Sequence, residues 1–97
     1  MARASQQLED FIDESIRVSK EHGYNPTVFV SMRHDLGTLP AISKLAVSPD
    51  LQSGFRKLRE LGLLTWSIEA AVLKFPSEFS ADVRAAAEWR LNQVAKA

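Results

Sequence analysis

Glycine and proline divide this chain of 97 residues into short segments at regular intervals. The four glycines are at positions 23, 37, 54 and 62, and the four prolines are at positions 26, 40, 49 and 76. Glycine is favoured just after a helix and proline in its first turn, so most of these positions mark helix ends or starts. No long stretch alternates apolar and polar residues, and no Asn-Gly or Asp-Gly pair marks a hairpin. The sequence therefore predicts an all-α fold of five or six short helices.

Three helices are expected in the first half of the chain. The first covers residues 5–22 and has acidic residues early and basic residues late, the order that the helix dipole favours. Asn25 is expected to cap a second helix that opens with Pro26 and ends at Gly37. A short third helix follows Thr38.

The second half contains three further expected elements. Ser48 and Pro49 begin a fourth helix, whose apolar seam ends just before Gly62. Residues 65–75 fit a helix that starts at Ser67, although Thr-Trp-Ser-Ile could also begin a strand, and we favour the helix. Ser80 is expected to cap the last helix. We expect the middle helices to pack orthogonally, as in a helix-turn-helix.

The composition is that of an ordinary globular domain. Apolar residues make up 45% and charged residues 25%, and the length suits one domain over residues 1–97, with frayed ends at residues 1–4 and 96–97. The absence of cysteine excludes disulfides and thiolate metal sites. No signal peptide and no apolar run of membrane length is visible, so we expect a cytoplasmic protein that does not enter the membrane.

The stretch SPDLQSGFRKLRELGLL, residues 48–64, has features of a DNA-reading helix. Gln52, Arg56 and Arg59 follow one flank of its apolar seam and could bind bases or phosphates. Against this, the preceding turn is about one residue short for a helix-turn-helix and no wing follows. Glu60 can pair with Lys57 or Arg56, and 12 basic residues balance 12 acidic ones over the chain. DNA binding is therefore the alternative function.

The residues that could carry catalysis do not form a constellation. His22 stands just before a helix-ending glycine, where a cation complements the dipole. His34 precedes Asp35, but adjacent residues on a helix point in different directions. No spaced metal-ligand motif or phosphate loop is present. We therefore expect neither an enzyme nor a cofactor or metal site.

Aromatic residues are the candidates for a protein interface. We name Trp66, Phe79 and Trp89 as the residues of an exposed patch that would dock on a partner. Trp89 lies off the apolar seam of the last helix, so it is either exposed or folded back over Ala85 and Ala86. We expect the chain to be a non-enzymatic binding or regulatory module that acts through protein contacts. The partner is unknown, and self-association into a homo-oligomer is one possibility.

Several short motifs occur in an order and spacing that one family shares. They are Tyr24-Asn25-Pro26-Thr27 with Phe29 and Met32; Gly37, Ala41 and Leu45; Gly54-Phe55, Leu58, Glu60-Leu61-Gly62 and Leu64; Ser67, Glu69-Ala70 and Val72-Leu73; and Phe79-Ser80 with Arg90-Leu91. On these residues the chain resembles an uncharacterised family of small bacterial all-helical proteins and domains with no assigned function. The resemblance implies a helical fold, a helix over residues 67–73 and an accessory role, sometimes beside nuclease or restriction-type genes.

The chain departs from that family pattern within and just after the fourth helix. Relatives commonly have an aromatic residue before Glu60, where this chain has Arg59, and the chain also differs at Lys57. Leu63 stands where arginine is common, and Trp66 stands where leucine is common. This chain therefore lacks a basic residue that relatives commonly have and that could bind DNA, which further disfavours the DNA-reading hypothesis.

Overall fold

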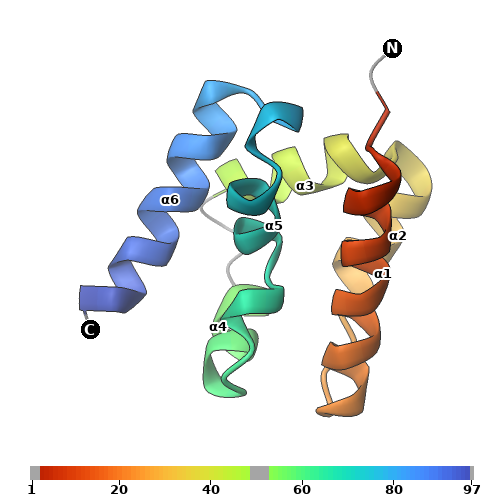
Figure 1. Cartoon of the computed structure of the whole chain (residues 1–97). Helices are drawn as coiled ribbons and strands as arrows, with labels where there is room; N and C mark the ends of the chain where they lie inside the picture. The colour runs from red at the N-terminus through yellow and green to blue at the C-terminus, as the bar shows by residue number, and fades with distance from the viewer. Residues whose placement is uncertain (1–2, 49–52, 97) are drawn as a thin grey trace.

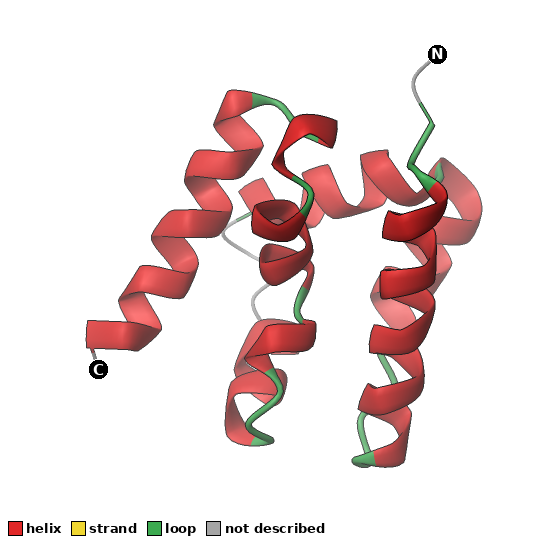
Figure 2. Ribbon diagram, in the orientation of Figure 1, coloured by secondary structure: helices red, strands yellow, loops and turns green. Residues whose placement is uncertain are grey.

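Every regular element in the described part of the chain is helical. The computed structural model describes residues 3–48 and 53–96, and Figure 2 shows helices joined by short loops, with no strand in either range. The α-helices are α1 (Gln6–Glu21), α2 (Thr27–Leu36), α3 (Thr38–Val47), α4 (Ser53–Glu60), α5 (Ile68–Lys74) and α6 (Ala81–Lys96). Two 3-10 helices, η1 (Leu64–Trp66) and η2 (Pro76–Glu78), precede α5 and α6. The prediction of a small all-α bundle is confirmed.

The helices surround α5, which is the shortest α-helix and lies near the middle of the molecule. In Figure 1, α1 and α2 run side by side at one side, α6 lies at the other, and α3 crosses behind α5. α3 contacts α2, α5 and α6, so it connects the two sides. The radius of gyration is 12.3 Å, about the value expected for a single compact domain of this length.

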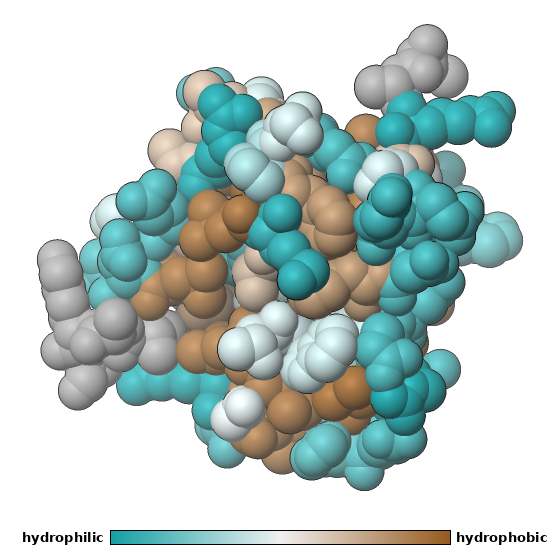
Figure 3. All heavy atoms as spheres, viewed as in Figure 1, coloured by the Kyte–Doolittle hydropathy of each residue, from teal (hydrophilic) through white to brown (hydrophobic). Residues whose placement is uncertain are grey.

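The hydrophobic core lies where α1, α3, α5 and α6 converge. Its least exposed apolar side chains are Leu8 and Ile12 of α1, Ala41, Ile42 and Ala46 of α3, Ala71 and Val72 of α5, and Ala87 of α6. The small alanines allow close helix approach, and the branched side chains fill the remaining space. Figure 3 shows polar residues over the outward face of α1 and apolar residues gathered over the middle of the molecule. Hydrophobic burial among these four helices therefore positions the remaining elements.

The segment after α4 is helical, as predicted. η1 and α5 are separated by Ser67, whose extended backbone and buried hydroxyl form the N-cap of α5. The backbone N–H of Ala70 donates to Ser67 Oγ at 3.0 Å, which satisfies one of the donors left free at the start of a helix. The alternative of a strand beginning at Thr65 is wrong, because residues 64–66 form a 3-10 turn.

The predicted start of the second helix is wrong by one residue. Asn25 does not cap α2; the residue at the N-cap is Pro26, and no side-chain hydrogen bond caps this helix. Pro26 has ψ 65°, outside the helical range, so the helix begins at Thr27 rather than at the proline. The Pro26 ring is buried instead, which shows that packing decided its conformation.

The N-terminal end of the described chain contacts the rest of the domain. Ala4, within the predicted frayed residues 1–4, packs against the core, and the backbone N–H of Ser5 donates to Glu78 Oε1 at 2.6 Å. α6 extends to Lys96. Residues 1–2 and 97 lie outside the described residues.

Candidate functional site

The sequence-predicted anchor Trp89 lies on the surface of α6. Its side chain is 62% exposed, the highest fraction among the large apolar side chains in the described ranges. Val83, Ala87 and Arg90 form the buried side of the same helix, and Trp89 stands off that side. This exposure is inconsistent with the alternative in which Trp89 folds back over the neighbouring alanines.

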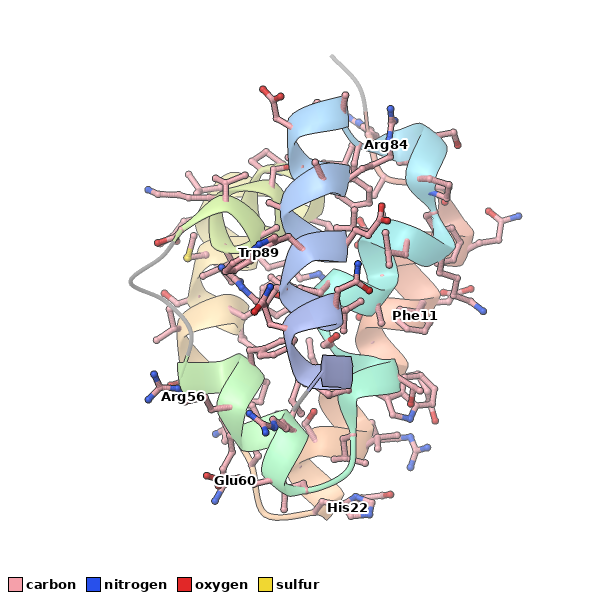
Figure 4. The ribbon with its side chains drawn as sticks, turned by 90° about the vertical axis from the view of Figure 1, so that its left-hand side faces the viewer. Phe11, His22, Arg56, Glu60, Arg84 and Trp89 are labelled. Carbon is pink, nitrogen blue, oxygen red and sulfur yellow. The ribbon has the colours of Figure 1, made fainter. Side chains whose placement is uncertain are left out.

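Val47 contributes a second exposed apolar side chain, at the end of α3 that Arg90 contacts. Arg90, the residue after Trp89, donates to the carbonyl oxygens of Leu45 at 3.3 Å and Ser48 at 2.9 Å, which flank Val47 in the chain. Val47 is itself half-exposed at the end of α3. Figure 4 shows Trp89 on the side of α6 nearer to α3. Trp89 and Val47 are thus exposed on two helices that meet where Arg90 contacts the end of α3.

A buried ion pair fixes α6 beside this area. Arg90 Nη1 lies 2.6 Å from Glu69 Oε2, and both side chains are almost completely buried. Burial raises the pKa of the Glu69 carboxyl, although its hydrogen bond to Arg90 acts in the opposite direction. Arg90 also donates to two carbonyls at the C-terminal end of α3, and the Leu45 carbonyl accepts in addition from the backbone N–H of Ser48. A single side chain thus joins α3, α5 and α6.

The other two predicted interface residues do not join Trp89. Phe79 belongs to the hydrophobic core and is only 6% exposed, so its predicted place on an exposed patch is wrong. It follows η2, where the chain turns inward before α6. Trp66 is half-buried and stacks on Phe11, with ring centroids 5.2 Å apart. Its backbone carbonyl accepts a hydrogen bond from Ser15, so Trp66 closes a corner between η1 and α1.

The basic residues of α4 are exposed. Arg56 and Arg59 both face solvent, and Figure 4 shows Arg56 and Glu60 extending outward from α4. No ion pair involves either arginine among residues 3–48 and 53–96, so the predicted pairing with Glu60 is absent there. α4 packs mainly against η1. Gln52, the third predicted DNA ligand, lies outside the described residues.

Neither histidine belongs to a chemical site. The His22 ring contacts the carbonyl of Val18 in the last turn of its own helix, at 2.9 Å. His34 lies 3.3 Å from Asp35, and both side chains are largely exposed. Within the described ranges, no group of three or more histidine or acidic side chains could hold a metal ion. None of the described helices has the length and apolar character needed to cross a membrane.

The structure also forms a cavity that the sequence did not reveal. It lies between α1, α2, α4 and α5, has a volume of about 100 Å³, and is lined by residues that include Ser19, Tyr24 and Glu69. These residues belong to separate elements, and each by itself fits an ordinary structural role. The one available signal was Glu69, an acidic residue flanked by Ile68 and Ala70 in a segment that helical spacing places against the core.

Comparisons with known proteins give no family or relative for this chain. No family model matches it, and neither a curated protein nor a solved structure matches it. The resemblance to a family of small bacterial helical proteins stays a prediction.

Proposed function

We propose that this chain is a non-enzymatic binding module that recognises a protein partner through the area of Trp89 and Val47. The observation that carries the proposal is the 62% exposure of Trp89 on a helix whose other large side chains are mostly buried or polar. Burying a tryptophan removes a large apolar surface from water at little cost in side-chain entropy, which makes exposed tryptophans frequent interface anchors. The proposal includes a cytoplasmic location and no cofactor, both of which rest on the sequence.

The fixed backbone beneath Trp89 supports this function. The neighbouring Arg90 makes three hydrogen bonds, to Glu69 and to the carbonyls of Leu45 and Ser48. α6 is therefore held in place before a partner arrives, and less conformational freedom is lost on binding. Glu88, Asn92 and Gln93 are exposed around the tryptophan and would form the polar rim that surrounds interface anchors.

The experiment begins with affinity capture of a companion protein and continues with the purified pair. Trp89→Ala should raise the dissociation constant by about 30-fold or more, because an interface anchor is lost. Leu36→Ala is the matched control, because Leu36 is also half-exposed but lies on α2, at the other side of the molecule. Equal affinity of the wild type and Trp89→Ala would refute the proposal.

Self-association is distinguished in the same proteins by sedimentation. If the partner is a second copy of this chain, the wild type and Leu36→Ala should dimerise, while Trp89→Ala should sediment as a monomer. A heterologous partner predicts that all three proteins are monomers when the companion is absent.

DNA is the second candidate, and one observation favours it. Arg56 and Arg59 are exposed on α4 and make no ion pair with any described residue, so both guanidinium groups are available for phosphate or base contacts. The balanced net charge of the chain and the packing of α4 on η1 oppose it.

A duplex mobility-shift assay tests the DNA candidate. Binding should weaken steeply with salt, and Arg56→Ala with Arg59→Ala should abolish it. Arg17→Ala is the control, because Arg17 is exposed on α1 and already paired with Glu14 and Glu21. A duplex that is not retarded at low salt excludes this function.

A further inference from the structure

We propose that the cavity between α1, α2, α4 and α5 binds a small uncharged ring compound that carries one hydrogen-bond donor, such as a phenol. This site is separate from the proposed protein-binding area, because neither Trp89 nor Val47 lines it. Its walls are largely apolar and aromatic, and Phe29, Phe55 and Trp66 contribute rings to them. Rigid aromatic walls with a few polar groups are typical of small-molecule sites.

The cavity lies where α4 faces α1 and α2. α4 makes its main contacts with η1, and α1 contacts η1 and α5 instead. Phe55 and Leu58 of α4 line the cavity, as do Ile16 of α1 and Phe29 of α2. Val28, at the start of α2, lines the cavity and is itself more than half exposed, so the cavity has an opening at this residue.

Glu69 supplies the polar group of the cavity wall. Its side chain is 2% exposed, and it lines the cavity from the first turn of α5. An ionised carboxylate has about four acceptor positions. Among the described residues, Arg90 is the one side chain that donates to it, and the backbone amide of Glu69 also contributes. Acceptor capacity therefore remains for a ligand.

The charge balance selects an uncharged ligand. The guanidinium of Arg90, 2.6 Å away, already neutralises the charge of Glu69. An ammonium ligand would lose its hydration in the cavity without meeting a net opposite charge, which is strongly unfavourable. A hydroxyl or ring N–H loses less on desolvation and gains an acceptor. A carboxylate or phosphate ligand would likewise lose its hydration in the cavity without meeting a net opposite charge.

The volume limits the ligand to about one ring. An apolar cavity of roughly 150 Å³ in another protein holds benzene. The present cavity measures about 100 Å³ and opens at Val28, so a six-membered ring fits if one edge reaches the opening. The hydroxyls of Ser15 and Ser19 also line it, but their protons are given to the carbonyls of Trp66 and Ser15.

Phenol and benzene are the probes for a first experiment. The chain has two tryptophans, and Trp66 lines the cavity whereas Trp89 is exposed on α6. In a nitrogen–proton correlation spectrum, phenol should move the indole signal of Trp66 saturably, with a dissociation constant below about 1 mM, and leave that of Trp89 in place. Benzene, which lacks the donor, should bind at least about 10-fold more weakly. The spectrum of Trp89→Ala assigns the two signals.

The probe experiment has outcomes that would overturn the proposal. The proposal is wrong if phenol causes no saturable shift of the Trp66 indole signal at 10-fold above that concentration. It is also wrong if the two indole signals move together. Equal affinity for phenol and benzene would remove Glu69 from the site. Each result leaves the protein-binding function of Trp89 untouched, because that function is measured with a partner protein.

Filling the cavity provides the second experiment. Ser19 donates within its own helix, to the carbonyl of Ser15, so Ser19→Leu breaks no contact between helices. It should abolish phenol binding and leave the melting temperature unchanged or raised. Ser31→Leu makes the same change at an exposed position of α2 and should bind phenol as the wild type does.

A variant at the opening covers the case in which Ser19→Leu does not fold. Val28→Trp adds bulk at an exposed position that lines the cavity, so the core is not disturbed. Loss of phenol binding in this folded variant supports the site. Unchanged phenol binding in whichever of the two variants folds contradicts it.

Discussion

Arg90 and Glu69 form a buried ion pair that joins α6 to α5. Arg90 Nη1 lies 2.6 Å from Glu69 Oε2. The same nitrogen lies 3.3 Å from the carbonyl oxygen of Leu45, and Nη2 lies 2.9 Å from that of Ser48. Arg90 Nε is buried and has no partner among the described residues. The pair fixes the helix that presents Trp89, while Glu69 also lines the cavity. The two proposed binding sites therefore share one structural support.

Removing the arginine should be strongly destabilising. Arg90→Met leaves Glu69 buried without its cation, and the free energy of unfolding should fall by about 3–5 kcal/mol. Urea denaturation followed by circular dichroism measures this change. The double variant Glu69→Met with Arg90→Met removes both charges and should recover at least about 1 kcal/mol of that loss. A double variant that is less stable than Arg90→Met would show that the unpaired carboxylate is not the main cost.

The stability contribution of Glu69 should decrease as the pH rises. Burial raises the pKa of Glu69 above its ordinary value of 4.5, so the folded state holds the proton more tightly than the unfolded state does. The associated stability is fully present below the unfolded pKa and is lost as the pH rises through the folded pKa. The free energy of unfolding of the wild type should therefore fall, relative to that of Glu69→Gln, as the pH rises above about 4.5. A shift in the opposite direction, in urea titrations between pH 4 and 8, would mean that Arg90 outweighs burial.

The N-cap of α1 should contribute more to the free energy of unfolding than the N-cap of α6 does. Ser5 Oγ accepts from the backbone N–H of Leu8 at 3.1 Å and donates to Glu78 Oε2 at 2.7 Å, so it both caps α1 and holds η2. Ser5→Ala should lower the free energy of unfolding by about 1–2 kcal/mol. Ser80→Ala is the comparison, because Ser80 Oγ accepts from Val83 at a longer 3.4 Å and should cost about 0.5 kcal/mol. Equal losses in thermal and urea denaturation would contradict the added role of Glu78.

Local signals in the sequence account for most of the helices. Ser67 and Ser80 precede helices at their predicted positions, and Gly23, Gly37 and Gly62 follow helix ends, because both effects act within one helical turn. Pro26 is the exception: its ring is buried, and packing moved the start of α2. Local rules fail where a distant part of the chain determines the backbone.

The binding surfaces were less predictable than the helices. Trp89 could be placed off the apolar seam from helical spacing, and it is exposed. Phe79 could not be assigned in this way, because it lies in a connection with no periodicity and its burial depends on how η2 turns. Glu69 and Arg90 are 21 residues apart on different helices, and their contact depends on the packing of α5 against α6. The cavity depends on the relative positions of four helices, which no spacing rule gives.

An arginine between α1 and α2 should be harder to replace than one on the surface of α1. Arg33 Nη1 and Nη2 each lie 2.8 Å from a carboxylate of α1, on Asp13 and Glu9, and Nε donates to Thr38 Oγ1 at 3.0 Å. Burial alone would lower the pKa of Arg33, but these carboxylates raise it. Lysine cannot form this fork, so Arg33→Lys should cost about 1 kcal/mol of unfolding free energy. Arg17→Lys, at an exposed site, should give a smaller loss in the same urea titration, and a larger loss would refute this ranking.

The junction between α2 and α3 should tolerate only glycine at position 37. Gly37 has φ 94° and ψ 165°, a region that side chains with a Cβ rarely adopt, and it allows α3 to begin one residue after α2 ends. The space around a Cβ is not the obstacle, since its nearest neighbour would be Pro40 at 3.8 Å. Gly37→Ala should therefore lower the free energy of unfolding by about 1–3 kcal/mol through backbone strain alone. Because Leu45 of α3 contacts Arg90, the neighbour of Trp89, the variant should also broaden the nuclear magnetic resonance signal of the Trp89 indole. Wild-type stability in Gly37→Ala would show that the junction can adopt another backbone conformation without loss.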